Sequence, residues 1–474
     1  MRPTLYFIFL FYFLFSYAQQ GNYKFNNFGN RSILLAGNVT GSVEDIGLTI
    51  YNPSRLTEVE NVGFSFNAKA YQLTNLKLNN VVNGQESKLE NTNFDGVATM
   101  AGGVFNLFGT RFAYSFLTKT RFNYRFNFSN NVTNDDIIEG FPDVILHNIN
   151  TGLGTSVKDD WSGLTWAYKL NNKLSLGISL FGSIYEYKGN TDLNHTIKSS
   201  NNDVAFYQNI SGFRQKSYGL FFKLGANYHF KNFDLGINMN LPYIEIYEEG
   251  SFNYKKVIAG AGTENNQYLE TFYDNIKSKR KEPFGLSIGA GIPFRKSKLH
   301  LNIDYVSGLN KYDKLSIPDL NTGASDLTEV NFKESRKSVI NFGVGAEIYL
   351  NEKLKSYVGF TTDFNSFESN ANIFDLSNDG TKDINIGEDF YHTSLGIDWK
   401  LNWASIILGM TYTQGTADFT SPLNLDINDI YSEDASLSNL KYSRWQVVIG
   451  LEIPLFNEKV NDLLNKKESK NKSE

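Results

Sequence analysis

Apolar and polar residues alternate along the segment from Arg111 to Phe128. Most even-numbered positions are Phe or Tyr, whereas Arg, Lys, Ser and Asn dominate the odd-numbered positions. Successive side chains of a strand point to opposite faces, so this pattern predicts a strand with one apolar and one polar face. The segment is also far longer than the usual strand of about 5–6 residues. A transmembrane β-barrel, with lipid outside and a polar lumen inside, accounts for both features.

The same alternation recurs in about fourteen segments along the chain, joined by connections that are short and long in turn. Short connections such as Asn171-Asn172 and Lys231-Asn232 alternate with long ones such as 129–158, 189–212 and 248–282. Outer-membrane barrels have short periplasmic turns, longer extracellular loops and an even number of strands. The sequence therefore predicts an all-β fold, a transmembrane antiparallel β-barrel of about 14 strands over residues 62–456.

The N-terminus has the pattern of a secretory signal peptide. Arg2 precedes an apolar run from Leu5 to Phe15, and Ser16-Tyr17-Ala18 follows. The run is shorter than the roughly 20 residues of a spanning helix, which predicts a signal peptide over residues 1–18 rather than a membrane anchor. At the other end, residues 457–474 are mostly charged or polar, and we expect a periplasmic tail there.

Composition agrees with a barrel and excludes several kinds of chemistry. Aromatic residues make up 15% of the chain, which suits the aromatic girdles of outer-membrane barrels. The chain has no cysteine, hence no disulfide or thiolate metal site, and its net charge of −5 offers no basic excess for nucleic acid. The five histidines have no metal-ligand spacing, and no catalytic motif is found. We expect no enzyme activity, cofactor or metal.

Residues 19–61 do not alternate and contain Ala36-Gly37, Asp45, Tyr51-Asn52-Pro53 and Leu56. This set resembles the FadL/TodX family of outer-membrane transporters for long-chain fatty acids and other hydrophobic compounds, although Ser54 and Arg55 depart from its pattern. The resemblance implies that residues 19–61 form a hatch, a plug inside the barrel. It also implies a lumen ligand whose lateral exit is opened by hatch movement and by an inward kink of the third strand. A plain Asn-Pro turn is the alternative interpretation of Asn52 and Pro53.

Candidate ligand-binding or gating residues come from the hatch and from the inward faces of strands. The alternation predicts that the even-numbered residues from Phe112 to Phe128 face lipid, while Arg111, Arg121 and Arg125 face the lumen. Cations there could attract a carboxylate or form a charge network, and aromatic residues on polar faces could line a ligand path or pack against the hatch. The candidates are Asn52, Pro53, Leu56, Arg121, Arg125, Lys223, Phe181, Tyr185 and Phe221.

The leading functional hypothesis is passive transport of long-chain fatty acids or other hydrophobic small molecules through a hatch-gated barrel in the outer membrane of a Gram-negative bacterium. Expected partners are the hydrophobic ligand and the surrounding outer-membrane lipid and lipopolysaccharide. The resemblance also allows a second role, because some family members act as partners or shuttles in the type IX protein secretion system of Bacteroidota. A soluble exported β protein is the third hypothesis.

Overall fold

The computed structural model describes residues 22–59, 63–79, 88–132, 143–260, 262, 266–321, 329–367, 389–420 and 437–454. The predicted signal peptide (1–18) and charged tail (457–474) lie outside these residues. The helices of the described part are α1 (Arg31–Leu34), α2 (Leu48–Tyr51) and the 3-10 helix η2 (Pro53–Glu58). Among the described residues, no helix is long and apolar enough to cross a membrane.

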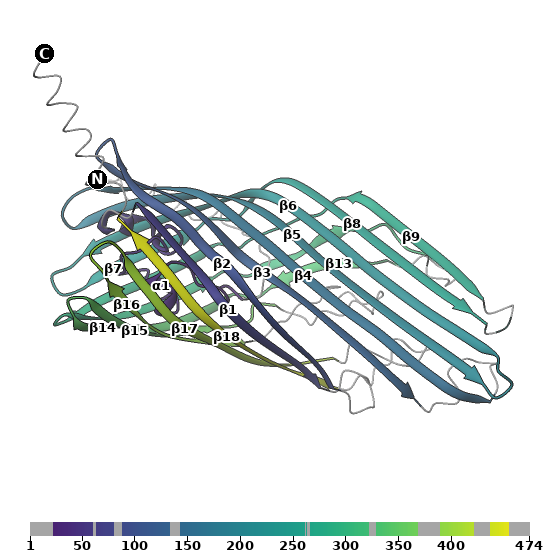
Figure 1. The fold of residues 1–474 in the computed structure, drawn as a ribbon. Helices are drawn as coiled ribbons and strands as arrows, with labels where there is room; N and C mark the ends of the chain where they lie inside the picture. Colours follow the sequence, from purple (N-terminus) through teal and green to yellow (C-terminus); the bar gives the residue numbers. More distant parts are fainter. Residues whose placement is uncertain are drawn as a thin grey trace, which may run out of the picture.

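Fourteen strands close into one antiparallel barrel, which confirms the predicted fold class (Figure 1). The ladder between β5 and β6 completes the ring. In ring order the strands are β1 (Phe64–Asn79), β2 (Lys88–Leu107), β3 (Thr110–Val132), β4 (Val144–Lys169), β5 (Leu174–Ser199), β6 (Val204–His229), β7 (Asp234–Asn240), β10 (Gly285–Phe294), β11 (Ser297–Val306), β14 (Val339–Asn351), β15 (Leu354–Asp363), β16 (Asp389–Lys400), β17 (Ser405–Thr420) and β18 (Leu437–Ile453).

The wall is much taller on one side than on the other (Figure 1). Strands β4, β5 and β6 have 26 residues each, whereas β10, β11 and β15 have 10 each. Much of the chain predicted as the loops 129–158, 189–212 and 248–282 is therefore strand, and those boundaries were wrong. Beyond the lipid the outer face of a strand meets water and carries polar residues, so the hydrophobic alternation weakens while the inner face stays buried and the backbone ladder continues.

Four further strands lie on the extracellular side of the ring. β8 (Ile244–Ala259) pairs with the extracellular half of β6, and β9 (Gln267–Ile276) pairs with β8. β12 (Leu309–Ser316) and β13 (Asn331–Arg336) form a separate hairpin. These strands extend the tall side of the wall and contribute to the filling of its inner face.

Strand β3 contains a β-bulge at which its two faces exchange. The ladder to β4 passes from Thr118↔Asp160 to Thr120↔Asp159 and skips Lys119. On the periplasmic side of the bulge, Leu117 is buried and faces the lumen. On the extracellular side, the buried residues that face the lumen are even-numbered, among them Tyr124 and Phe126.

This bulge overturns part of the predicted orientation of β3. One extra residue shifts every later side chain to the opposite face. The even-numbered aromatic residues face outward only as far as Phe116, and Phe126 lies in the lumen. Arg121 and Arg125 are exposed on the outer face, so the prediction that they point into the lumen was wrong.

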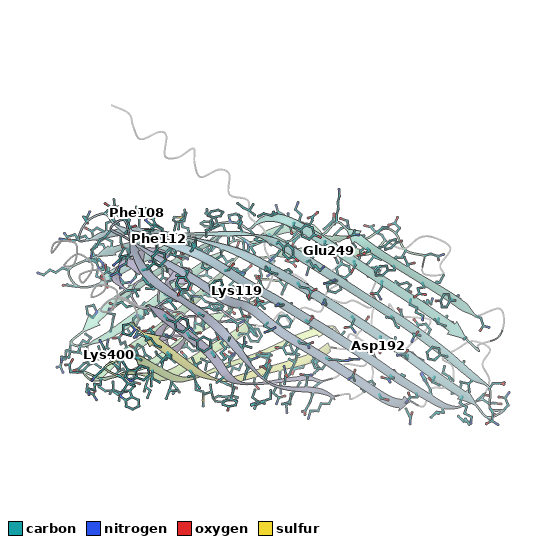
Figure 2. All side chains as sticks on the ribbon, turned by 45° about the horizontal axis from the view of Figure 1, so that its top comes forward. Phe108, Phe112, Lys119, Asp192, Glu249 and Lys400 are labelled. Carbon is teal, nitrogen blue, oxygen red and sulfur yellow. The ribbon has the colours of Figure 1, made fainter. Side chains whose placement is uncertain are left out.

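The outer face carries an apolar band between the two polar ends of the barrel. On β5, Leu176, Leu180 and Ile184 are exposed outward. The outward apolar stretch from Leu174 to Ile184 covers about eleven residues, close to the roughly 9–11 that a tilted strand needs to cross a membrane. Figure 2 shows Phe108 near one end of the barrel and Asp192 toward the other.

Candidate functional site

The N-terminal residues 22–59 lie inside the barrel, against the inner wall of its periplasmic half. Leu34 and Leu35 pack with Tyr357 of β15 and Ile407 of β17. Leu56 packs on the opposite side with Val104, Ala113 and Ala167 of β2, β3 and β4, which are members of one buried cluster. This placement is consistent with the predicted hatch, and residues 22–59 are called the hatch below.

Asn52 and Pro53 form a helix start that also contacts the wall. The Asn52 side-chain oxygen accepts hydrogen bonds from the backbone N–H (3.2 Å) and the hydroxyl (2.7 Å) of Ser54, and Pro53 occupies the first turn of η2. The Asn52 amide donates to the carbonyl oxygens of Thr40 (2.7 Å) and Ala226 of β6 (3.3 Å). The Asn-Pro pair is therefore a turn and a hatch–wall contact at once.

The hatch main chain approaches the wall mainly where the wall has glycine. A Cβ added to Gly359 would lie 2.3 Å from the backbone carbon of Leu35, and one on Gly177 would lie 2.5 Å from that of Pro53. No larger residue fits at such distances without displacing the hatch. At Gly177, Gly236, Gly289 and Gly359 the nearest hatch atom is a main-chain atom, and at eight further glycines it is a side-chain atom. We call these twelve residues the glycine belt: Gly102, Gly177, Gly225, Gly236, Gly289, Gly291, Gly343, Gly345, Gly359, Gly396, Gly409 and Gly450.

Ion pairs add to these close contacts. Arg31 of the hatch lies 2.7 Å from Asp398 of β16 and 2.9 Å from Glu452 of β18. Burial opposes the charge of Arg31, but these two carboxylates outweigh burial and hold its pKa above the usual range. Further hatch–wall pairs are Lys24–Asp304 (2.7 Å), Arg55–Asp234 (3.6 Å) and Glu58–Lys169 (3.3 Å).

A cavity of about 130 Å³ lies between the hatch and the wall. Its aromatic lining includes Trp161 of β4 and Phe221 of β6, whose rings stack with centroids 4.2 Å apart. Polar residues complete the lining, so the cavity offers both apolar surface and hydrogen-bonding groups. Residues that line it include Tyr23, Lys24, Asn26, Phe28, Ile50, Tyr51, Lys119, Trp161, Phe221, Lys223, Asn240, Glu282 and Asp304.

Two lysines at this cavity form no ion pair with any described residue. Lys119, the bulge residue of β3, has its ammonium nitrogen 5.4 Å from the ring centre of Phe28 and 6.0 Å from that of Trp161. The ammonium of Lys223 donates to the side-chain oxygen of Asn240 at 2.5 Å. The carboxylates at the cavity have other partners, because Asp304 pairs with Lys24 and Glu282 with Arg280. The cavity is thus suited to a negatively charged group.

Residues 277–284, which join β9 to β10, form the extracellular boundary of the cavity and are called the roof segment. The guanidinium of Arg280 lies 2.7 Å from Asp159 of β4 and 3.0 Å from Glu282, and it donates to Ser183 at 2.9 Å. It also stacks over the ring of Tyr185, 4.0 Å from its centre. Burial disfavours the charge of Arg280, but the nearby carboxylates raise its pKa above the usual range.

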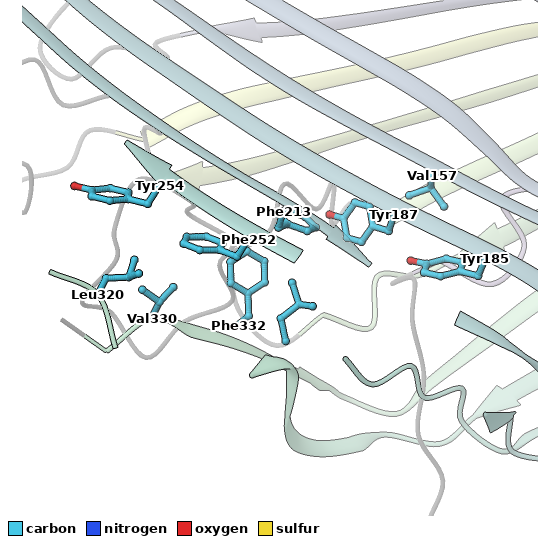
Figure 3. Packing of buried hydrophobic residues seen from close by; sticks show 10 residues of the cluster. Val157, Tyr185, Tyr187, Phe213, Phe252, Tyr254, Leu320, Val330 and Phe332 are labelled. Carbon is cyan, nitrogen blue, oxygen red and sulfur yellow. The ribbon is translucent and has the colours of Figure 1, made fainter. Parts of the chain in front are cut away.

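Above the roof segment, the lumen is filled by aromatic side chains (Figure 3). Phe332 of β13 packs against Phe213 of β6, with ring centres 4.8 Å apart, and against Phe252 of β8 at 6.1 Å. Tyr187 of β5 and Leu315 of β12 belong to the same cluster. The β12–β13 hairpin therefore occupies the extracellular part of the lumen.

The wall ladder is interrupted beside the cavity. β2 and β3 pair from Leu107↔Thr110 to Met100↔Leu117, but no ladder pair joins their described residues beyond that point. A side-chain bond from Asn91 to the carbonyl of Arg125 (2.7 Å) links them further out. Lys119 lies at this ladder break, and its carbonyl accepts a hydrogen bond from Asn26 of the hatch at 3.2 Å. β3 thus has a β-bulge beside the ladder break, and the inward kink expected of the third strand stays a prediction.

The sequence-predicted candidates divide into three groups. Lys223 and Phe221 line the cavity. Phe181 is fully buried beside Trp161, and Tyr185 contacts Arg280. Asn52, Pro53 and Leu56 hold the hatch against the wall, whereas Arg121 and Arg125 are outside the lumen.

Sequence reasoning missed Trp161, Arg280 and Glu282. Trp161 could have been found, because it shares the inward face of its strand with Asp159 and Thr165. The roof residues carried no such signal, since they lie outside any alternating segment. Within the described residues, no group of three or more His, Asp or Glu side chains could hold a metal ion.

These features define a class of protein, the outer-membrane β-barrel, as the sequence predicted, with residues 22–59 of the chain inside it. Among solved structures, the chain is similar to a FadL homologue from Pseudomonas aeruginosa (TM-score 0.59, 11% identity, 92% of this chain and 99% of that one). It is also similar to the Pseudomonas putida toluene transporter TodX (TM-score 0.54, 12% identity, 90% and 98%). The chain therefore has the FadL/TodX fold, as its hatch residues indicated. No family model and no curated protein matches the sequence.

Proposed function

We propose that this protein carries hydrophobic small molecules passively across the outer membrane, and that the cavity above the hatch is its ligand site. The observation that carries the proposal is an aromatic cavity at a break in the wall ladder, with two lysines that form no ion pair with a carboxylate of the residues the structure describes. The similarity in fold to a toluene transporter supports a transport role.

The lining favours a ligand with an apolar body and one negative charge. Cavities of about 150 Å³ hold a molecule the size of benzene, so this cavity accepts a compact ring or one segment of a longer chain. A carboxylate between Lys119 and Lys223 would gain charge-assisted hydrogen bonds from both. A fatty acid, with its head group in the cavity, has this chemistry.

The ladder break supplies a route for lateral release into the membrane. Asn26 connects the hatch to the main chain of Lys119, so a shift of the hatch residues near Asn26 would act directly on the β3 bulge. We infer that hatch and bulge together gate the passage, while the glycine belt keeps the rest of the hatch in place.

The test compares uptake of a radiolabelled long-chain fatty acid with that of toluene, in cells that produce equal amounts of inserted barrel. The variant Lys119→Met with Lys223→Met should lower fatty-acid uptake by about tenfold or more, since each lysine supplies a charged hydrogen bond, and should leave toluene uptake nearly unchanged. The control Lys77→Met with Lys441→Met removes two outward lysines of β1 and β18 and should change neither.

An equal loss of uptake for the fatty acid and for toluene would show that the two lysines are structural. A second variant lacking residues 22–56 tests gating, because the strands pair without the hatch. It should still insert as a barrel and should leak small solutes. If the hatch-deleted barrel admits small solutes no faster than the wild type does, the hatch is not the proposed gate.

A role as a partner in protein secretion is the second candidate. The β12–β13 hairpin and its aromatic cluster fill the extracellular lumen, which favours a barrel whose outer parts bind other proteins. If correctly inserted wild-type barrel takes up neither substrate, this candidate replaces transport.

A further inference from the structure

Six basic side chains share the outer face of the tall wall: Arg121, Arg125, Lys158, Lys188, Arg214 and Lys216. We call them the outer basic patch. They come from four neighbouring strands, β3 to β6, and each is exposed or half-buried. The ladders place Lys158 directly opposite Arg121 on one side and opposite Glu186 on the other, and Lys188 opposite Arg214. The patch is therefore continuous across the strands.

The patch begins where the apolar band ends. On β5, the last large apolar outward side chain is Ile184, and Glu186 and Lys188 follow at the next outward positions. On β6, Tyr218 is followed in the same way by Lys216 and Arg214. Because the band has the length of one membrane crossing, these cations stand at the head-group level of the outer leaflet.

Acidic neighbours compensate only part of this positive charge. Glu186 contacts Lys188 (3.0 Å) and Arg214 (2.6 Å), and Lys216 pairs with Glu249 of β8 (3.1 Å). Figure 2 shows Glu249 over the same tall wall. Asp160 pairs with Lys158 at 3.1 Å. Six cations thus face three ion-paired carboxylates, and Arg121 also interacts at longer range with Asp95 of β2. Neither Arg121 nor Arg125 forms an ion pair with another described residue.

The opposite side of the barrel has no comparable group among its described residues. There the apolar band ends in Tyr412 of β17 and Trp445 of β18, whose rings stack 4.3 Å apart. The outward residues that follow are Gln414 and Ser443. Further out, Lys441 of β18 lies directly opposite Lys77 of β1, so positive charge is denser on β3 to β6 but is not confined to them.

We propose that the outer basic patch binds the phosphate groups of the phosphorylated glycolipid that forms the outer leaflet, with Arg121 and Arg125 as its principal ligands. Guanidinium groups bind phosphate through paired hydrogen bonds, and the apolar band directly below accommodates the acyl chains of the same molecule. The patch lies beside the ladder break, because Arg121 follows the bulge by two residues. The proposal rests on the membrane-spanning fold and not on the proposed transport.

The probe is bisphosphorylated lipid A in mixed micelles of a nonionic detergent, titrated against the purified barrel, with binding followed by the rise in unfolding temperature. Arg121→Gln with Arg125→Gln should weaken binding by about tenfold or more, since each arginine supplies a charged hydrogen bond. The control Lys77→Gln with Lys441→Gln removes the same charge from the outer face of β1 and β18, outside the outer basic patch, and should bind like the wild type. Dephosphorylated lipid A should bind to all three proteins with the same low affinity.

Each other outcome overturns the proposal. An equal loss of affinity for lipid A in the control variant would mean that binding depends on the net charge of the protein and not on this patch. Inorganic phosphate that competes at the same concentration as lipid A would indicate a site for free anions. Phosphatidylglycerol micelles that bind equally tightly would indicate general attraction to anionic lipid. Unfolding temperatures without lipid should agree among the three proteins, because all four substituted side chains are exposed or half-buried on the outer face.

Discussion

The hatch meets the periplasmic half of the wall through close packing on glycine main chain and through ion pairs, whereas the extracellular half of the lumen is filled through long side chains. In the periplasmic half, the backbone of Leu35 or Pro53 lies against glycine, with no room for even one methyl group. In the extracellular half, Arg280 and Phe332 reach across to strands β4 and β6. The same barrel thus uses two different ways to close its lumen.

This difference has a consequence for motion. Hatch atoms packed directly on the glycine main chain of the wall leave little room for a second arrangement, since any displacement breaks many close contacts at once. A contact made by a side chain can change rotamer while its backbone stays in place. We therefore expect ligand-linked movement in the roof segment and near the β3 bulge, and little movement along the glycine belt.

The largest expected effect is the loss of the buried ion pair in the roof segment. Asp159→Asn leaves the guanidinium of Arg280 buried with only Glu282 as a charged partner. Removal of one partner of a buried pair typically costs about 3–5 kcal/mol. The roof segment contains Lys277, Lys279, Arg280 and Lys281, so its opening can be measured as trypsin cleavage of the folded barrel.

The matched control for this prediction is Asp160→Asn, at the neighbouring outward position. Asp160 pairs with the half-exposed Lys158, and an exposed pair is worth about 0–1 kcal/mol. Cleavage of the roof segment should rise strongly in the Asp159 variant and stay at the wild-type rate in the Asp160 variant. Resistance of both variants to trypsin would mean that other contacts hold the roof.

A smaller effect is expected from a methyl group in the glycine belt. Gly359→Ala places a Cβ 2.3 Å from the backbone of Leu35, and such overpacking costs about 1–3 kcal/mol. Gly182→Ala is the control, because the nearest atom to its Cβ would be 3.8 Å away. Amide exchange of hatch residues should accelerate in the first variant alone. Unchanged exchange would show that the hatch can shift to accept the methyl group, contrary to the rigid docking argued above.

The sequence could predict the ring of fourteen strands because lipid on one side and lumen on the other impose alternation. It could not predict the faces of Arg121 and Arg125. A bulge of one residue leaves the alternation in the sequence intact, but beyond it the positions that faced lipid face the lumen, and the reverse. The glycine belt was visible in principle, as glycines recur near the periplasmic ends of most hairpins. The roof segment was not, because its residues take their positions from ion pairs between distant parts of the chain.

The smallest expected effect concerns the ladder break, where a side-chain hydrogen bond joins the described parts of β2 and β3 in place of a backbone ladder. Beyond Leu117 the described parts of β2 and β3 share no ladder, and the amide of Asn91 donates to the carbonyl of Arg125. Asn91→Ala removes a bond worth about 0.5–1.5 kcal/mol and should speed amide exchange in β3 near Arg125. Asn148→Ala is the control: its side chain also bridges two strands, β4 and β3, but a continuous backbone ladder joins them as well. If both variants exchange at the wild-type rate, the two strands are held together at the break by contacts other than this amide. Faster exchange in the Asn91 variant, together with faster release of ligand, would instead place the exit at the break.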